Sequence, residues 1–155
     1  MESYYYNVDV NWENKRKGIV CSPELNKKNG VCIEVATPPE FPQGIEGIWS
    51  PEHLFVAAVS GCLMTTFLAI AENSTLDFTI FRCAAIGTIE MIEGKLMMSQ
   101  ISLKPTVVIH NDTHRNKAMR ILKKVESACL IANSIKSKIT TELVVQVNPI
   151  LLECK

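Results

Sequence analysis

Cysteine is the residue type with the most chemical potential in this 155-residue chain, and two of the six cysteines stand out. Cys62 and Cys129 each lie in a segment whose pattern predicts a helix, and each directly follows two small residues, Ser-Gly and Ser-Ala respectively. Small neighbours allow a second helix or a substrate to approach a sulfur atom closely. The two thiols are therefore either a reactive pair or two small apolar side chains packed in the core.

The other four cysteines lie in predicted strands or in the C-terminal tail, where we expect packed or exposed thiols: Cys21, Cys32, Cys83 and Cys154. Residues 1–12 lack the basic and then apolar order of a secretory signal. We therefore expect a cytoplasmic protein, in which most cysteines are thiols and structural disulfides are rare.

Charge and motif content exclude several functional classes. Sixteen Lys and Arg balance sixteen Asp and Glu, so no net charge steers the chain to nucleic acid or to an anionic membrane. Phosphate-loop, nucleophile-elbow, zinc-protease and CxxC motifs are absent, and His110 and His114 have no nearby ligand to complete a metal site. We expect no cofactor, no metal, no nucleic acid partner and no membrane partner. His53, beside Glu52, is either an exposed histidine of a first helical turn or a functional group.

A long apolar segment must position Cys62. Residues 54–71 contain no charged side chain, which is the length of a short membrane span. Hydroxyl residues inside the segment, and flanks without a Lys or Arg cluster, favour instead a helix buried in a core or in a dimer interface. An N-cap residue, a proline suited to the first helical position and an acidic residue mark the helix start: Ser50, Pro51 and Glu52.

Alternating apolar and polar residues predict strands on both sides of this helix. The predicted strands are Tyr4–Trp12, Gly18–Ser22, Val31–Ala36, Phe78–Ile92, Leu96–His110 and Thr140–Val147. Turn residues at 26–30 and at 93–94 predict two hairpins.

A second helix should position Cys129. Asn111 or Asp112 is a suitable cap, and the apolar stripe that follows is expected to run from Ala118 past Cys129 to Ile135. The order of elements predicts a single α+β domain, residues 1–155, built on antiparallel sheet.

The segment SPEHLFVAAVSGCLMTTFLAIAE resembles the PE-L-x-A-A-x-x-x-C signature of the OsmC/Ohr family, the osmotically inducible and organic hydroperoxide resistance proteins. The later segment ESACLIANSIK is similar to the second signature of that family, in which a cysteine precedes a small polar segment. Members usually carry His before and Pro after that cysteine, where this chain has Ala128 and Leu130. The order and size of the elements extend the resemblance over nearly the whole chain.

The resemblance implies an intertwined homodimer in which antiparallel sheets wrap around a long buried central helix. It also implies a thiol peroxidase of the antioxidant response that reduces organic hydroperoxides. Cys62 would attack the peroxide, Cys129 would resolve the product as a disulfide, and Arg16 and Glu52 would hold the thiolate. A dithiol reductant, such as a lipoylated protein, would regenerate the two thiols.

The position of Cys62 adds a physical requirement. It lies about ten residues into its helix, where the field of the helix dipole has faded, so its thiolate needs an external cation. Arg16 is the best candidate, because its guanidinium is always charged and a carboxylate such as Glu52 can hold it, although Lys15 and Lys17 are adjacent. About 15 Å of straight helix separates Glu52 from Cys62, which favours a bend, a later helix start or a partner subunit.

Four apolar side chains near Cys62 would favour an organic hydroperoxide over hydrogen peroxide, unless they belong to the core: Phe55, Leu63, Met64 and Phe67.

Two other functions stay open. The departures on either side of Cys129 are compatible with a redox-sensing or ligand-binding family member without peroxidase turnover. A long apolar helix against antiparallel sheet also describes hot-dog folds, in which Glu52 could be the base of an acyl-thioester hydrolase.

Overall fold

The computed structural model describes residues 2–25 and 31–148 of the chain. The chain divides into two compact units, Met1–Leu54 and Phe55–Lys155, and each is described by itself. The single-domain organisation expected from the sequence stays a prediction.

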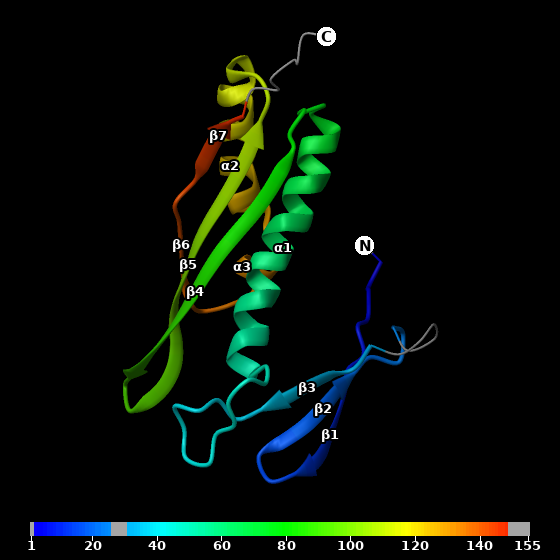
Figure 1. Cartoon of the computed structure of the whole chain (residues 1–155), viewed down its shortest axis with the longest axis vertical. Helices are drawn as coiled ribbons and strands as arrows, with labels where there is room; N and C mark the ends of the chain where they lie inside the picture. The colour runs from blue at the N-terminus through cyan, green and yellow to red at the C-terminus, as the bar shows by residue number, and fades with distance from the viewer. Residues whose placement is uncertain (1, 26–30, 149–155) are drawn as a thin grey trace, which may run out of the picture. The chain divides into compact units, whose positions relative to one another are not determined.

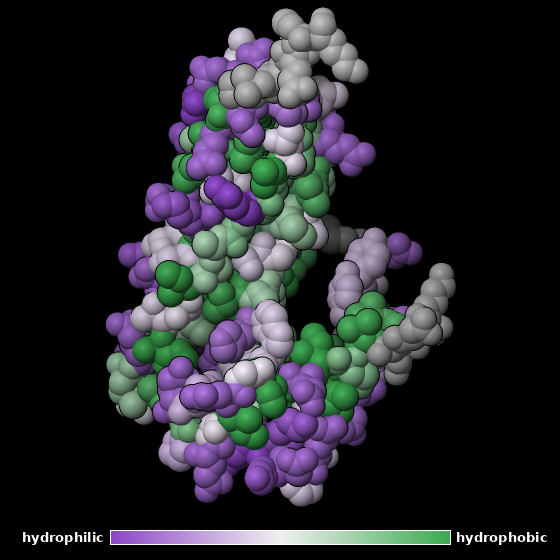
Figure 2. Space-filling model, viewed as in Figure 1, coloured by the Kyte–Doolittle hydropathy of each residue, from purple (hydrophilic) through white to green (hydrophobic). Residues whose placement is uncertain are grey.

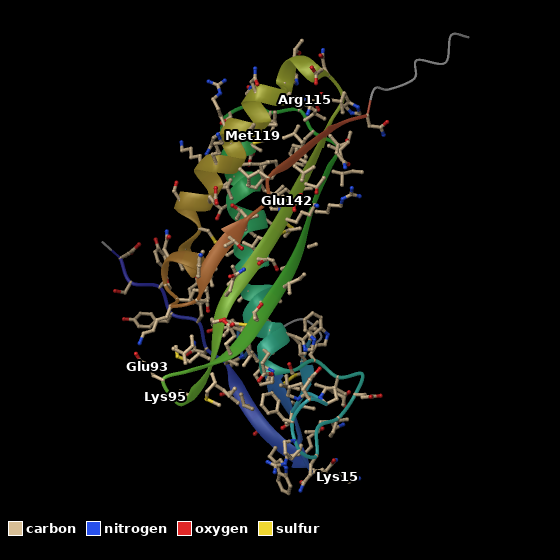
Figure 3. The ribbon with its side chains drawn as sticks, turned by 90° about the vertical axis from the view of Figure 1, so that its left-hand side faces the viewer. Lys15, Glu93, Lys95, Arg115, Met119 and Glu142 are labelled. Carbon is tan, nitrogen blue, oxygen red and sulfur yellow. A yellow bond between two sulfur atoms is a disulfide. The ribbon has the colours of Figure 1, made fainter. Side chains whose placement is uncertain are left out.

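The first unit contains a small antiparallel sheet of three strands in the order β1 (Asp9–Asn14), β2 (Lys17–Cys21) and β3 (Ile33–Ala36) (Figure 1). Strand β1 begins five residues later than the predicted strand at Tyr4, and all its residues are exposed. The predicted pairing of β2 with β3 is confirmed, whereas its predicted turn at 26–30 lies outside the described residues. Figure 3 shows Lys15 at the turn between β1 and β2, where its φ of 47° is left-handed.

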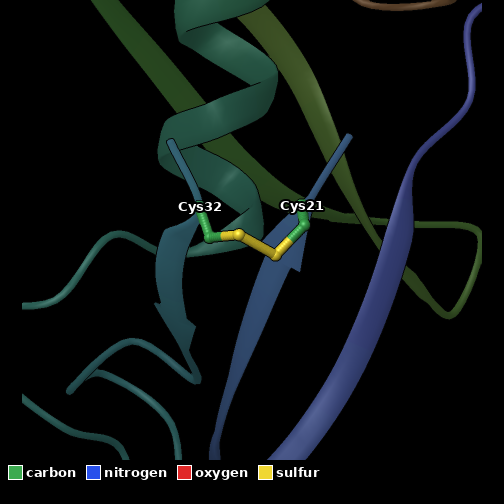
Figure 4. Close-up of a disulfide and its surroundings, with 2 residues drawn as sticks. All are labelled: Cys21 and Cys32. Carbon is green, nitrogen blue, oxygen red and sulfur yellow. A yellow bond between two sulfur atoms is a disulfide. The ribbon is translucent and has the colours of Figure 1, made fainter. Parts of the chain in front are cut away.

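A disulfide joins Cys21, the last residue of β2, to Cys32, the residue before β3 (Figure 4). The expectation of two thiols at these positions is therefore wrong. Antiparallel pairing places the two Cα atoms 4.5 Å apart, a separation that a disulfide can span. The sequence-based expectation rested on compartment and not on the proximity that the hairpin creates. Cys154 lies outside the described residues.

Helix α1 (Pro51–Asn73) confirms the predicted apolar helix and its start. The fully buried Ser50 acts as the N-cap, because its Oγ accepts the backbone N–H of His53 at 3.2 Å. By length and composition alone α1 could cross a membrane, a property it shares with core helices of soluble proteins.

Only one face of α1 is buried within the chain. The buried residues recur every four positions and form a single stripe: Val59, Leu63, Phe67 and Ala71. Phe55, Met64 and Leu68 of the helix are exposed, and Figure 2 shows apolar residues at the surface over α1. The homodimer expected to bury the whole helix stays a prediction.

The second unit contains a long hairpin of β4 (Ile80–Ile92) and β5 (Lys95–Ile109), as predicted. Glu93 and Gly94 form its tight turn with φ values of 48° and 77°, and Figure 3 shows Glu93 and Lys95 at the tip. Position 94 favours glycine because left-handed backbone is costly for other residues. The hairpin runs alongside α1 (Figure 1).

The predicted last strand is instead two short strands, β6 (Lys138–Thr141) and β7 (Val144–Val147), both parallel to β5. The sheet is therefore mixed and not purely antiparallel. The reason is the connection: a helical crossover returns the chain to the start of β5, and a strand that follows such a crossover runs parallel.

This crossover contains α2 (Arg115–Ala128) and the short α3 (Leu130–Asn133). A 3-10 turn at Asp112–His114 precedes α2, and the Asn111 side chain caps this turn by accepting the N–H of Thr113. The predicted cap of the helix thus lies at the turn before it, because α2 itself starts after His114, which makes no side-chain capping bond. Alternate residues of β5 meet the buried stripes of α1 and α2 in one apolar cluster, which includes Ile101, Val107, Ile109, Phe67, Leu122 and Val125. Both helices therefore pack on the same face of the sheet.

Gly87 in β4 sets how closely α1 approaches the hairpin. A Cβ at this position would lie 2.6 Å from the Cγ2 of Val56 on α1 and 2.6 Å from the Sδ of Met98 on β5. Both separations are far below van der Waals contact. The missing side chain thus allows close contact between helix and sheet.

Candidate active site at two thiols

Cys62 and Cys129 come together from two helical segments of the second unit. Cys62 is half-buried in the middle of α1. Cys129 is fully buried and lies between α2 and α3, where its φ of −68° and ψ of 109° are extended. The prediction that one helical stripe continues through Cys129 to Ile135 is therefore wrong, because the helix breaks at the cysteine itself.

The break at Cys129 is stabilised by polar contacts on both sides. The Asn133 side chain donates to the carbonyl oxygen of Ser127 at 3.0 Å, which satisfies a carbonyl at the end of α2. The backbone N–H of Asn133 donates to the carbonyl of Cys129, also at 3.0 Å, and closes the single turn of α3. This arrangement leaves the first N–H groups of α3 free to bind another acceptor.

That acceptor is the sulfur of Cys62. The N–H of Ile131 donates to Cys62 Sγ at 3.5 Å. Burial disfavours the Cys62 thiolate, but hydrogen bonds from the Ile131 N–H, the Cys129 thiol, the Thr66 hydroxyl and the Leu130 N–H outweigh it. Together they hold the pKa of Cys62 below the usual value of a thiol.

Cys129 has the opposite electrostatic environment. Burial raises the pKa of its thiol, and the neighbouring Cys62 sulfur raises it further. Its Sγ also lies 4.0 Å from the carbonyl oxygen of Val59, a contact that a protonated thiol makes as donor. The pair thus combines one sulfur disposed to ionise with one disposed to keep its proton.

The third free cysteine of the described residues, Cys83 on β4, lacks these features. It is half-buried, and burial raises the pKa of its thiol. This environment agrees with the expected role of a packed apolar residue.

Arg16 and Glu52 line one open pocket of the first unit, with a volume of about 380 Å³. The other lining residues are mostly prolines and apolar groups: Thr37, Pro38, Phe41, Pro42 and Pro51. Arg16 Nε donates to the side-chain oxygen of Gln43 at 3.4 Å, and within the described residues Arg16 forms no ion pair with Glu52. Glu52 Oε2 is buried and has no hydrogen-bond partner in that part of the chain.

The two lysines next to Arg16 differ from it. Lys17 forms ion pairs with Glu13 at 3.3 Å and with Glu34 at 2.7 Å, which raise the pKa of its ammonium group. Lys15 occupies the exposed left-handed turn position and does not line the pocket. Of these three cations, Arg16 is the one in the pocket beside Glu52.

His53 and two of the four apolar residues expected to line a substrate site, Leu63 and Phe67, contribute to the structure of the protein. His53 Nδ1 lies 2.8 Å from Ser50 Oγ at the start of α1. Within residues 2–25 and 31–148, no cluster of His, Cys, Asp and Glu could hold a metal ion. Leu63 and Phe67 belong to the core, so the hypothesis that they line a substrate site is wrong, whereas Phe55 and Met64 are exposed.

Sequence reasoning missed the groups that contact the Cys62 sulfur most directly, namely the N–H groups of Leu130 and Ile131 and the Thr66 hydroxyl. Thr66 follows Cys62 by four positions, so helical spacing could have identified it. The N–H groups of Leu130 and Ile131 are available as donors because the helix breaks at Cys129. The apolar periodicity of the sequence continues across this break and therefore does not predict it.

The sequence and the fold of this chain are similar to those of known proteins. An uncharacterized protein of Bacillus subtilis (strain 168), YmaD, is 23% identical over 146 residues, which cover 92% of this chain and 94% of that protein. An OsmC-like protein of unknown function from Vibrio cholerae has a similar fold, with a TM-score of 0.80, 23% identity and coverage of 92% of this chain and 100% of that one.

An organic hydroperoxide resistance protein from Legionella pneumophila superposes with a TM-score of 0.70 at 18% identity, and the match covers 95% of this chain and 100% of that chain. The sequence model of the family described as OsmC-like protein matches residues 44–144, a range that includes both Cys62 and Cys129. This match extends over well more than half of the chain, and the chain therefore belongs to the OsmC-like protein family.

Proposed function

We propose that this protein is a cysteine-based peroxidase that reduces organic hydroperoxides. The observation that carries the proposal is the pairing of Cys62, whose sulfur accepts the Ile131 N–H and whose pKa is lowered, with the buried Cys129, whose pKa is raised. A thiolate is the form of cysteine that attacks an O–O bond, and a nearby thiol is what resolves the oxidised product.

The first step forms an S–O bond and breaks the O–O bond. The Cys62 thiolate attacks the terminal oxygen of ROOH, gives its electron pair to that oxygen and becomes a sulfenic acid. The leaving alkoxide takes a proton and departs as the alcohol ROH. The N–H groups that hold the Cys62 sulfur lower its pKa and so favour the ionised form that attacks.

The second step forms the disulfide. The Cys129 sulfur attacks the Cys62 sulfenic acid, and hydroxide leaves and takes up the Cys129 proton as water. A dithiol then donates two electrons and two protons, restores both thiols and becomes a disulfide itself. The proposed reductant is a dithiol cofactor such as the lipoyl group of a lipoylated protein, and the proposed compartment is the cytoplasm.

Arg16 and Glu52 are proposed to complete the site. Glu52, whose Oε2 has no hydrogen-bond partner among the described residues, and Arg16 line one pocket, so a movement of the arginine side chain toward Glu52 would form a carboxylate-held cation. Since Glu52 and Cys62 are ten residues apart in sequence, we propose that the Arg16 and Glu52 of one protomer serve the Cys62 of its partner.

The proposed homodimer is supported by the apolar residues that α1 leaves exposed in a single chain. Phe55, Met64 and Leu68 are between 37% and 42% exposed, and a partner would remove this surface from water. Light scattering at micromolar concentration is expected to give the mass of a dimer. A stable monomer would contradict the shared site.

Mass spectrometry after one equivalent of an organic hydroperoxide tests the chemistry. A linkage between the peptides of Cys62 and Cys129 is the expected product. The same experiment with Cys83→Ser should give the same linkage, because Cys83 has no part in the reaction. If no linkage forms, the peroxidase proposal is wrong.

Turnover then separates a peroxidase from a redox sensor. With excess dihydrolipoamide and repeated additions of hydroperoxide, we expect many equivalents of ROH per chain. If only one equivalent of ROH forms per chain and the Cys62–Cys129 disulfide persists in the presence of the dithiol, the protein is a sensor.

A further inference from the structure

The Cys21–Cys32 disulfide lies at one end of the β2–β3 pair (Figure 4). Both cysteines are only half-buried, so a small thiol reagent can reach them. The proposed peroxide chemistry does not use this disulfide. It is thus a second sulfur pair, in a different unit of the chain from Cys62 and Cys129.

Within a single chain, the sheet that carries this disulfide buries few side chains. All six residues of β1 are exposed, the residues of β2 are half-buried, and β3 contributes Ala36 as its one fully buried residue. A small sheet with few buried side chains is marginally stable, so a covalent crosslink makes a large contribution to its order. The disulfide of Cys21 and Cys32 is such a crosslink.

The β2–β3 pairing connects the disulfide to the Arg16 and Glu52 pocket. Four residue pairs follow the disulfide, from Val20 opposite Ile33 to Lys17 opposite Ala36. The next contact along the same two strands is a hydrogen bond from the Thr37 N–H to the Arg16 carbonyl oxygen at 3.1 Å. Thr37 and Arg16 both line the pocket.

We propose that Cys21 and Cys32 form a redox modification site that controls the order of the β2–β3 pair and, with it, the Arg16 and Glu52 pocket. A small dithiol is the reductant. It donates two electrons to the S–S bond, Cys21 and Cys32 each take up a proton, and the dithiol becomes a disulfide. Reduction removes the crosslink that limits the unfolded conformations of this hairpin, so the short ladder opens more often.

Hydrogen exchange of the full chain tests the proposal without reference to peroxide consumption, so failure of the peroxidase assignment would leave this test intact. The protein is equilibrated with oxidised and reduced dithiothreitol in varied ratios. Free thiols are then alkylated, and mass spectrometry reports the redox state of each cysteine. In parallel, amide exchange is followed in peptides of β2, β3 and β5.

We expect reduction of Cys21 and Cys32 to raise exchange in residues 17–21 and 33–37 by about tenfold or more. Amide exchange in β5 should stay unchanged, because β5 belongs to the other unit of the chain, which contains neither Cys21 nor Cys32. Unchanged exchange in both strands after complete reduction would overturn the proposal. So would recovery of Cys21 and Cys32 as free thiols from protein kept under air.

Variants separate loss of the crosslink from a general effect of the dithiol. The double variant Cys21→Ser/Cys32→Ser should show the fast exchange of the reduced protein and no response to dithiothreitol. Cys83→Ser, the matched control, should respond as the wild type does. If the double variant exchanges as slowly as the oxidised wild type, the disulfide does not control the sheet.

Discussion

The backbone N–H of Ile131 donates to the Cys62 sulfur, although the two residues lie 69 positions apart in the sequence. The contact exists because the helix breaks at Cys129 and leaves the first N–H groups of α3 without helical acceptors. Part of the stabilisation of the Cys62 thiolate therefore comes from the backbone of the same unit. A cation such as Arg16 would add to it.

The three free thiols of the described residues, Cys62, Cys83 and Cys129, should react with iodoacetamide in a defined order as the pH rises. Hydrogen bonds to the sulfur lower the pKa of Cys62, whereas burial raises the pKa values of Cys83 and Cys129. Alkylation of Cys62 should therefore reach half its maximal rate at a lower pH than alkylation of the other two. Peptide mass spectrometry across a pH series measures this order. Simultaneous reaction of Cys62 and Cys83 would contradict it.

Leu130→Pro should raise the Cys62 pKa and shift its alkylation profile to higher pH. Proline removes the Leu130 N–H, one of the donors to the Cys62 sulfur. The fold should tolerate it, because residue 130 is the first of α3, the preceding residue is extended, and the Leu130 side chain is exposed.

Leu130→Ala is the matched control, since it keeps the N–H. Its alkylation profile should equal that of the wild type. A Leu130→Pro profile without any shift to higher pH would show that this donor does not stabilise the thiolate.

Cys62→Ser should abolish peroxide consumption, because serine cannot supply a nucleophilic thiolate. Cys129→Ser should still permit one attack and accumulate Cys62 as a sulfenic acid or a more oxidised form. Mass spectrometry of the intact protein distinguishes these products by added oxygen. If Cys62→Ser consumes peroxide at the wild-type rate, the peroxidase proposal is wrong and the acyl-thioester hydrolase hypothesis is favoured.

Arg16→Ala should slow peroxide attack at neutral pH and recover in part in alkali, where the thiolate forms without a cation. Lys15→Ala and Lys17→Ala are the controls and should remain within a few-fold of the wild-type rate. The readout is the pH profile of peroxide consumption. Loss of activity in a lysine variant with a normal Arg16→Ala profile would identify that lysine as the activating cation.

Glu52→Ala combines two opposite effects. Removal of a negative charge favours the thiolate, whereas release of Arg16 into water weakens its attraction to the sulfur. We expect the second effect to dominate and the rate to fall, with Glu52→Gln intermediate because its amide oxygen still accepts a hydrogen bond. A rate above wild type for either variant would contradict the positioning role.

Ser50→Ala should lower the free energy of unfolding by about 1 kcal/mol. The substitution removes the side-chain oxygen that accepts the His53 N–H at the start of α1. Urea unfolding measures the loss. Ser127→Ala, an exposed position whose hydroxyl donates to the Lys124 carbonyl oxygen, should change stability by less than about half that amount. Equal losses in the two variants would contradict the capping assignment.

Local signals in the sequence predicted the elements that depend on local rules. Ser50 and the residues that follow it mark the start of α1, and Glu93 with Gly94 marks the tip of the β4–β5 hairpin. N-capping and tight-turn formation involve neighbouring residues alone, so sequence is sufficient for them.

Features that depend on distant contacts escaped prediction. The helix break at Cys129 relies on Asn133, whose side chain binds the Ser127 carbonyl, and the apolar periodicity continues across the break. The β2–β3 pairing was predicted, but the Cys21–Cys32 disulfide at its end was not, because the expectation of thiols rested on the compartment. The parallel direction of β6 and β7 depends on the crossover through α2, which strand propensity does not encode.

Because Gly87 has no side chain, α1 packs against the sheet at a fixed, short separation. A helix transmits displacement along its axis as a nearly rigid rod, and Val56, which contacts Gly87, lies less than two turns before Cys62. An added methyl group at position 87 would require the Val56 or Met98 side chain to shift. Since Val56 and Cys62 share one helix, close packing at Gly87 helps to fix where the Cys62 sulfur meets the donors of α3.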